Sequence, residues 1–174
     1  MTLSSASPAP SAHPSPSQPP VPVVGAPAPD FTLVDHHGED RSLAAELKRR
    51  PALLVFYPFA FSRICGGELR ELQSSLGEFE GRGVSLFAVS CDPMFSLRVY
   101  AEQEDFGFPL LSDFWPHGEI ARAYGVFDEM KGCARRGSFL IGRDGVVQWS
   151  VVNPISEARP LSSYLDAIAV PNPS

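Results

Sequence analysis

The hydrophobic pattern of the chain predicts strands and helices that alternate along its length. Two continuous apolar runs, Ala52–Tyr57 and Val84–Ser90, are typical of strands that are buried on both faces of a sheet. Between them, Arg63–Glu80 carries large apolar residues at near-helical spacing, which predicts an amphipathic helix. Another helix is expected over Met94–Asp105. This order indicates an α/β fold with a mixed central sheet and flanking helices.

Smaller elements complete the predicted fold. The remaining elements are the strand Phe31–Val34, the helix Leu43–Lys48, the short strand Phe108–Leu111, the helix Glu119–Tyr124, the strands Gly137–Ile141 and Val146–Val152, and the closing helix Ser156–Ala169. Arg143-Asp144-Gly145 separates the last two strands and predicts a β-hairpin. Right-handed crossovers place the carboxyl ends of the two central strands at one sheet edge, where such folds usually carry their sites.

The ends of the chain differ in composition from its middle. Residues 1–22 consist mainly of Pro, Ser and Ala, and so few large apolar groups predict a disordered tail. A single domain is expected over residues 23–170, followed by a short tail at 171–174.

Charge and hydropathy exclude several classes of partner. The formal net charge is −6 and no block of Lys or Arg is present, so neither nucleic acid nor an anionic membrane surface is expected as a partner. No apolar run approaches the roughly 20 residues of a membrane span. The N-terminus lacks the basic start and apolar core of a secretory signal, which predicts a cytoplasmic protein.

Three cysteines, Cys65, Cys91 and Cys133, stand at wide spacings. Their odd number and the lack of a CxxC or Cys/His zinc pattern argue against a disulfide scaffold and against a bound metal. Cys65 falls in the first turn of the predicted helix, with Ser62 suited to its N-cap. The unpaired N–H groups and partial positive charge of a helix N-terminus favour the thiolate, which is the reactive form of cysteine.

The stretch from Pro58 to Cys65 resembles the signature of the peroxiredoxins, Pro-x-x-x-Thr/Ser-x-x-Cys after a central strand. The resemblance extends to Ala26–Phe31, Phe108–Asp113, Ala123–Val126, and Arg136–Ile141 with Asp144-Gly145. Within the family, Phe61–Leu69 and Leu111–Gly118 are similar to the actinobacterial alkyl hydroperoxide reductase E group. The resemblance implies a thioredoxin-like sandwich with the peroxiredoxin additions. It also implies reduction of hydrogen peroxide and organic hydroperoxides by a thiol, without a cofactor.

The resemblance assigns a role to each matching residue. Cys65 would attack the peroxide as a thiolate and become a sulfenic acid. Arg136 would stabilise charge on the departing oxygen, Ser62 would donate to the peroxide, and Pro58 would shield the sulfur. Glu68, one helical turn after Cys65, either holds an arginine in place or is an ordinary solvated charge.

Two arginines are adjacent at the matching position, and register alone separates them. The Gly-Ser-Phe that follows favours Arg136, while Arg135 would point to the other face of the strand.

The sequence leaves the reduction of the sulfenic acid open. Cys91 and Cys133 are possible resolving cysteines, while the default is a one-cysteine mechanism with an external thiol. The resemblance suggests mycothiol with a mycoredoxin, or a thioredoxin, as the reductant, and a homodimer as the assembly.

Two other functions remain as alternatives. A thioredoxin-like disulfide reductase is disfavoured because Gly66, Gly67 and Glu68 supply no second thiol. A peroxide-sensing or holdase-type interaction protein could use the same cysteine.

Overall fold

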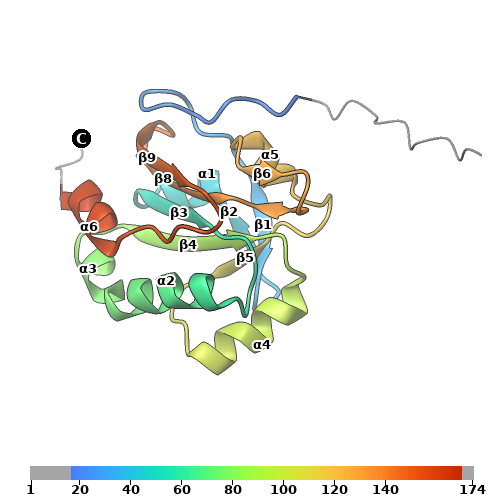
Figure 1. Ribbon diagram of the computed structural model, residues 1–174. Coiled ribbons are helices and arrows are strands. Elements are labelled where there is room, and N and C mark those ends of the chain that lie inside the picture. The colour runs from blue at the N-terminus through green and yellow to red at the C-terminus, as the bar shows by residue number, and fades with distance from the viewer. Residues whose placement is uncertain (1–16, 170–174) are drawn as a thin grey trace, which may run out of the picture.

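The computed structural model of the chain describes residues 17–169 (Figure 1). Residues 1–16, most of the predicted tail, and the predicted tail at 171–174 lie outside the described residues. Residues 17–22 lie against the domain, where the Gln18 side chain hydrogen-bonds to the backbone of Phe127. The predicted domain boundary at residue 23 therefore falls inside a segment that contacts the domain from Gln18 onward.

The chain forms an α/β structure in which helices and strands follow one another closely. In chain order the elements are β1 (Thr32–Asp35), β2 (Asp40–Ser42), α1 (Leu43–Leu47), β3 (Ala52–Phe56), α2 (Arg63–Ser74), α3 (Leu76–Gly81), β4 (Ser85–Ser90), α4 (Met94–Glu104), β5 (Leu110–Ser112), α5 (Glu119–Ala123), β6 (Phe127–Asp128), β7 (Cys133–Ala134), β8 (Arg136–Ile141), β9 (Val147–Asn153) and α6 (Leu161–Ala169). Within residues 17–169, no helix is long and apolar enough to cross a membrane.

A mixed seven-stranded sheet forms the centre of the molecule, in the order β2-β1-β5-β4-β3-β8-β9. Strand β3 runs parallel to β4 and antiparallel to β8, and β4 runs parallel to β5. Strands β6 and β7 form a separate antiparallel pair. The carboxyl ends of β3, β4 and β5 thus meet at one edge of the sheet, as the crossover rule predicts.

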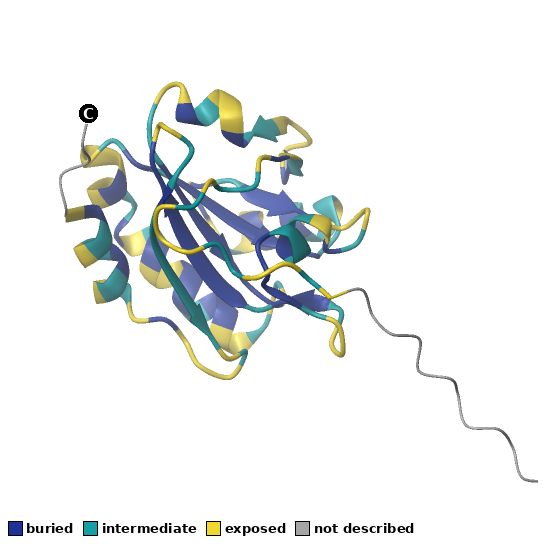
Figure 2. Ribbon diagram, turned by 90° about the horizontal axis from the view of Figure 1, so that it is seen from above, coloured by how far each residue is buried: buried dark blue, intermediate teal, exposed yellow. Residues whose placement is uncertain are grey.

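Helices cover both faces of the sheet (Figure 1). On one face, Leu53 and Val55 of β3 pack into a core with residues of α2, α3, α4 and α6. On the other face, Leu54 and Phe56 pack with residues of α1 and α5. Figure 2 shows the central strands buried between these layers. Because both faces are covered, β3 has to be apolar at every position, which confirms the prediction made from its continuous run.

Three features of the fold differ from the predicted elements. The single helix predicted over 63–80 is two helices, which meet at Ser75 with a non-helical ψ of 11°. The closing helix begins at Leu161, not at Ser156, and Pro160 disfavours a helical conformation for the residue before it. Strands β2, β6 and β7 were not predicted, because each has only two or three residues and lacks the apolar run that marks the equally short β5.

A buried carboxylate connects α5 to the edge of the sheet where the carboxyl ends of β3, β4 and β5 meet. Asp113 accepts hydrogen bonds from the N–H groups of Ile120 (3.1 Å) and Ala121 (2.9 Å) in the first turn of α5. Its own N–H donates to the carbonyl of Ser90 at the end of β4, at 2.8 Å. Burial outweighs the two N–H donors and raises the pKa of Asp113 to about 6.

This raised pKa predicts a pH-dependent stability. The folded state holds the Asp113 proton more tightly than the unfolded state, so the contribution of this group is present at low pH and is lost as pH rises towards 6. Between about pH 4 and pH 6 the loss amounts to about 3 kcal/mol. Urea unfolding at several pH values should show this decline in the wild type and a flatter profile in Asp113→Asn. Parallel profiles for the two proteins would contradict the assignment.

Candidate active site

The loop between β3 and α2 places a cysteine in the first turn of a helix. Ser62 is the N-cap of α2, with extended φ and ψ of −75° and 145°. Its Oγ accepts the Cys65 N–H at 3.3 Å. The N–H of Cys65 is therefore already engaged, while the Ser62 hydroxyl proton is free to be donated to another group. Cys65 is fully buried, and Pro58, at the start of the same loop, is buried as well.

The same loop is held in an unusual conformation by neighbouring elements. Phe61, directly before the N-cap, has a left-handed φ of 63°, which is unfavourable for a bulky residue. Its ring packs on Tyr100 of α4 with centroids 4.8 Å apart. The Asp92 carboxylate accepts the Ala60 N–H at 2.9 Å and the Ser90 hydroxyl at 2.8 Å. The end of β4 and helix α4 therefore fix the loop that carries the cysteine.

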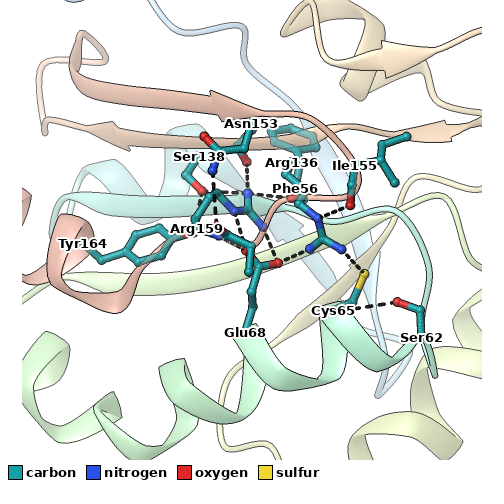
Figure 3. Close-up of polar contacts among 12 residues, drawn as sticks. Phe56, Ser62, Cys65, Glu68, Arg136, Ser138, Asn153, Ile155, Arg159 and Tyr164 are labelled. Carbon is teal, nitrogen blue, oxygen red and sulfur yellow. Dashed lines mark hydrogen bonds and ion pairs between the residues drawn. The ribbon is translucent and has the colours of Figure 1, made fainter.

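Arg136, the first residue of β8, brings a positive charge to the thiol. Its Nη2 lies 3.4 Å from the Cys65 Sγ, as Figure 3 shows. Its Nε donates to the Ile155 carbonyl at 2.6 Å, and its Nη1 donates to the Glu68 carboxylate. The neighbouring Arg135 points elsewhere and donates to the Gly125 carbonyl.

Glu68 is buried and lies between two arginines (Figure 3). It is bound by Arg136 through Oε2 and by Arg159 through both oxygens. The Arg159 backbone N–H reaches Oε1 at 2.6 Å and its Nε reaches the same atom at 3.0 Å. A solvated helix charge, one of the two alternatives for Glu68, does not describe this carboxylate.

Arg159 is the functional residue that sequence reasoning missed. It is fully buried, and its Nη1 donates to the carbonyls of Phe56 (2.8 Å) and Gly137 (2.9 Å) and to the Ser138 hydroxyl (2.9 Å). Ser138 in turn shares a hydrogen bond of 2.9 Å with Tyr164. Arg159 thus connects β3, β8 and α6 to the carboxylate that holds Arg136.

The other two cysteines are buried free thiols in different surroundings. Cys91 packs in the core on the opposite face of the sheet from Cys65. Burial raises the pKa of the Cys91 thiol to about 12 and that of the Cys133 thiol, in β7, to about 11. Both thiols are therefore protonated at neutral pH, which makes them poor nucleophiles.

Comparison with known proteins identifies the class to which this fold and site belong. The model of the AhpC/TSA family matches residues 24–150, well over half of the chain. Alkyl hydroperoxide reductase E of Mycobacterium tuberculosis is 43% identical over 146 residues, which cover 84% of this chain and 95% of the relative. Alkyl hydroperoxide reductase C of Staphylococcus aureus is 35% identical over 71% of this chain and 66% of its own length.

Solved structures agree with this assignment. Peroxidoxin BcpB from M. tuberculosis superposes with a TM-score of 0.76 at 28% identity, covering 86% of this chain and 98% of that one. The reduced 2-Cys peroxiredoxin of Plasmodium vivax gives a TM-score of 0.77 at 25% identity, covering 88% and 81%. The chain therefore belongs to the AhpC/TSA family of peroxiredoxins. It is a thiol-dependent hydroperoxide reductase with the α/β, thioredoxin-like fold expected for that class.

The buried ion-pair network predicts that loss of Arg159 lowers the free energy of unfolding far more than loss of the exposed Arg70. Replacing Arg159 with Met removes buried donors to Glu68 and to the carbonyls of Phe56 and Gly137, so the free energy of unfolding should fall by about 3–5 kcal/mol. The matched control is Arg70→Met, which removes an exposed ion pair with Glu104 and should cost at most about 1 kcal/mol. Urea unfolding measures both, and equal losses would contradict the central role of Arg159.

Proposed function

We propose that Cys65 is the peroxidatic nucleophile of this enzyme. Its thiolate attacks the terminal oxygen of a hydroperoxide, a new S–O bond forms, and the O–O bond breaks. Cys65 becomes a sulfenic acid, and the departing alkoxide or hydroxide takes up a proton to leave as an alcohol or water. Hydrogen peroxide and organic hydroperoxides are the proposed substrates, and relatives named alkyl hydroperoxide reductases support the organic ones.

The contact of Arg136 with the Cys65 sulfur is the observation that carries this proposal. A guanidinium 3.4 Å from Sγ lies where negative charge develops on the departing oxygen. Because Glu68 and Arg159 hold this guanidinium from behind, it is positioned before the peroxide binds. Ser62 can donate its hydroxyl proton to a peroxide oxygen, and Pro58 limits access of water to the sulfur.

We further propose a one-cysteine mechanism in which an external thiol reduces the sulfenic acid. Cys91 lies across the sheet from Cys65, and both other cysteines have strongly raised thiol pKa values. Mycothiol with a mycoredoxin is the proposed reductant, supported by the mycobacterial relatives, with a thioredoxin as the alternative. Three free thiols fit a cytoplasmic location, since that compartment keeps cysteines reduced.

The proposed assembly is a homodimer. Apolar side chains are exposed around the loop that carries Cys65 and on the adjoining helix α4. Phe61 is 54% exposed, while Phe95 and Val99, one turn apart on α4, are 68% and 46% exposed. Exposed apolar groups of this kind mark surfaces that associate with a protein partner. Sedimentation of the reduced chain tests the stoichiometry.

The reaction with peroxide should depend on Cys65 and on Arg136. Stopped-flow tryptophan fluorescence of the pre-reduced chain should show a fast reaction with hydrogen peroxide, which Cys65→Ser abolishes and which Cys91→Ser and Cys133→Ser retain. Arg136→Met should slow the reaction about 100-fold or more, because an electrostatic donor to the reacting oxygens is lost. Arg143→Met, at an exposed hairpin turn, is the control and should react at the wild-type rate. A wild-type rate no faster than that of free cysteine would argue against the whole proposal.

The mass of the oxidised chain separates the two routes of reduction. After one equivalent of hydrogen peroxide, the one-cysteine mechanism predicts that the intact protein gains one oxygen atom on Cys65. An internal disulfide with Cys91 or Cys133 would instead remove two hydrogen atoms. Trapping of the oxidised protein with a sulfenic-acid reagent, compared with the Cys91→Ser and Cys133→Ser variants, identifies the residue.

A further inference from the structure

We propose that the segment 17–28, the N-terminal strap, braces the catalytic arginine, and that Gln18 is a positioning residue acting through Arg136. The strap is no part of the site described above, and none of its hydrogen bonds within residues 17–169 reaches Cys65 or Arg136. The inference rests on the proposed role of Arg136.

Gln18 is attached to the domain by both ends of its side-chain amide. Its Nε2 donates to the Phe127 carbonyl at 3.0 Å, and its Oε1 accepts the Phe127 N–H at 2.9 Å. One side chain therefore satisfies both backbone groups of the first residue of β6, as a neighbouring strand would.

Gly125 shows that the strap is pressed closely against the domain. The residue has a left-handed φ of 67°, and a Cβ placed there would lie 2.7 Å from the Val21 nitrogen and 2.8 Å from the Pro19 oxygen. Only glycine combines this backbone conformation with so close an approach of another chain segment. Val21 also packs against the core on the α1 and α5 face of the sheet.

The other end of the strap is fixed to the edge of the sheet. The Gly25 N–H donates to the Val147 carbonyl at 2.8 Å, and the Val147 N–H donates to the Ala26 carbonyl at 2.9 Å. The strap therefore runs over the domain between two anchored ends, from β6 to the start of β9 (Figure 1).

The backbone that the strap covers also holds the entry to β8. The Arg135 N–H donates to the Val126 carbonyl at 2.6 Å, and the Arg135 guanidinium donates to the Gly125 carbonyl. Phe127 itself pairs with Ala134 across the β6–β7 hairpin. The residue that follows Arg135 is Arg136.

A short mechanical path thus leads from the strap to the thiol. Residues 125–127 contact the strap on one side and hydrogen-bond to Arg135 on the other. Release of Gln18 therefore loosens the backbone from which the Arg136 side chain extends. A shift of about 1 Å in a group that contacts the reacting atoms is enough to slow an enzymatic step substantially.

A double-mutant cycle on the full chain tests this path. Gln18→Met keeps the length of the side chain and removes both hydrogen bonds to Phe127. We expect it to slow the reaction of pre-reduced protein with hydrogen peroxide about 5- to 10-fold. In an Arg136→Met background the same substitution should have no further effect, because the group that it positions is absent. Gln103→Met, at an exposed position on α4, is the matched control and should react like the wild type.

A second variant tests the same path without changing Gln18. Gly125→Ala displaces the strap by the close approach described above, and it should slow the reaction in the wild-type background only. Wild-type kinetics for Gln18→Met, or an equal slowing in both backgrounds, would overturn the proposal and leave the role of Arg136 untouched. Unchanged kinetics for Arg136→Met alone would instead refute the proposed role of Arg136. The proposal that the strap acts through Arg136 would then fail as well.

Discussion

The architecture of the site depends on one buried carboxylate. Glu68 extends from the second turn of α2 and is bound by two guanidinium groups that come from β8 and from the segment before α6. Burying a charge is costly unless it is paired and hydrogen-bonded, and here both carboxylate oxygens have donors. The same pairing connects three distant parts of the chain. The position of Arg136 relative to Cys65 is thus a consequence of how the whole domain packs, not of the local sequence around the cysteine.

The three cysteines show how the surroundings of a thiol decide its chemistry. Cys65 stands at a helix N-terminus beside a guanidinium, whereas Cys91 and Cys133 are buried where desolvation raises their pKa. All three are inaccessible to solvent to a similar degree, so burial alone does not distinguish them. What distinguishes Cys65 is the charge that faces it.

The sequence predicted the parts of the molecule that have a local signature. The continuous apolar run of β3 and the Pro58-to-Cys65 pattern identified the central strand, the N-cap Ser62 and the helix after it. The separate β6–β7 hairpin escaped prediction because each strand has two residues. Arg159 escaped for a different reason. It contacts Glu68 from 91 positions away along the chain, and its neighbours, Ala158 and Pro160, give no sign that the side chain enters the core.

The pairing of Gly25 and Ala26 with Val147 has a consequence for the sheet as a whole. Strand β9 is an edge strand of seven residues without a charge or a proline, the type of edge that recruits further strands and leads to aggregation. The N-terminal segment occupies the hydrogen-bonding groups at the start of this edge, and within residues 17–169 no other segment pairs with its outer side. A strand added at this edge from another molecule therefore has only the later part of β9 to pair with. The N-terminal segment thus shortens the part of this edge that is open to pairing with another molecule.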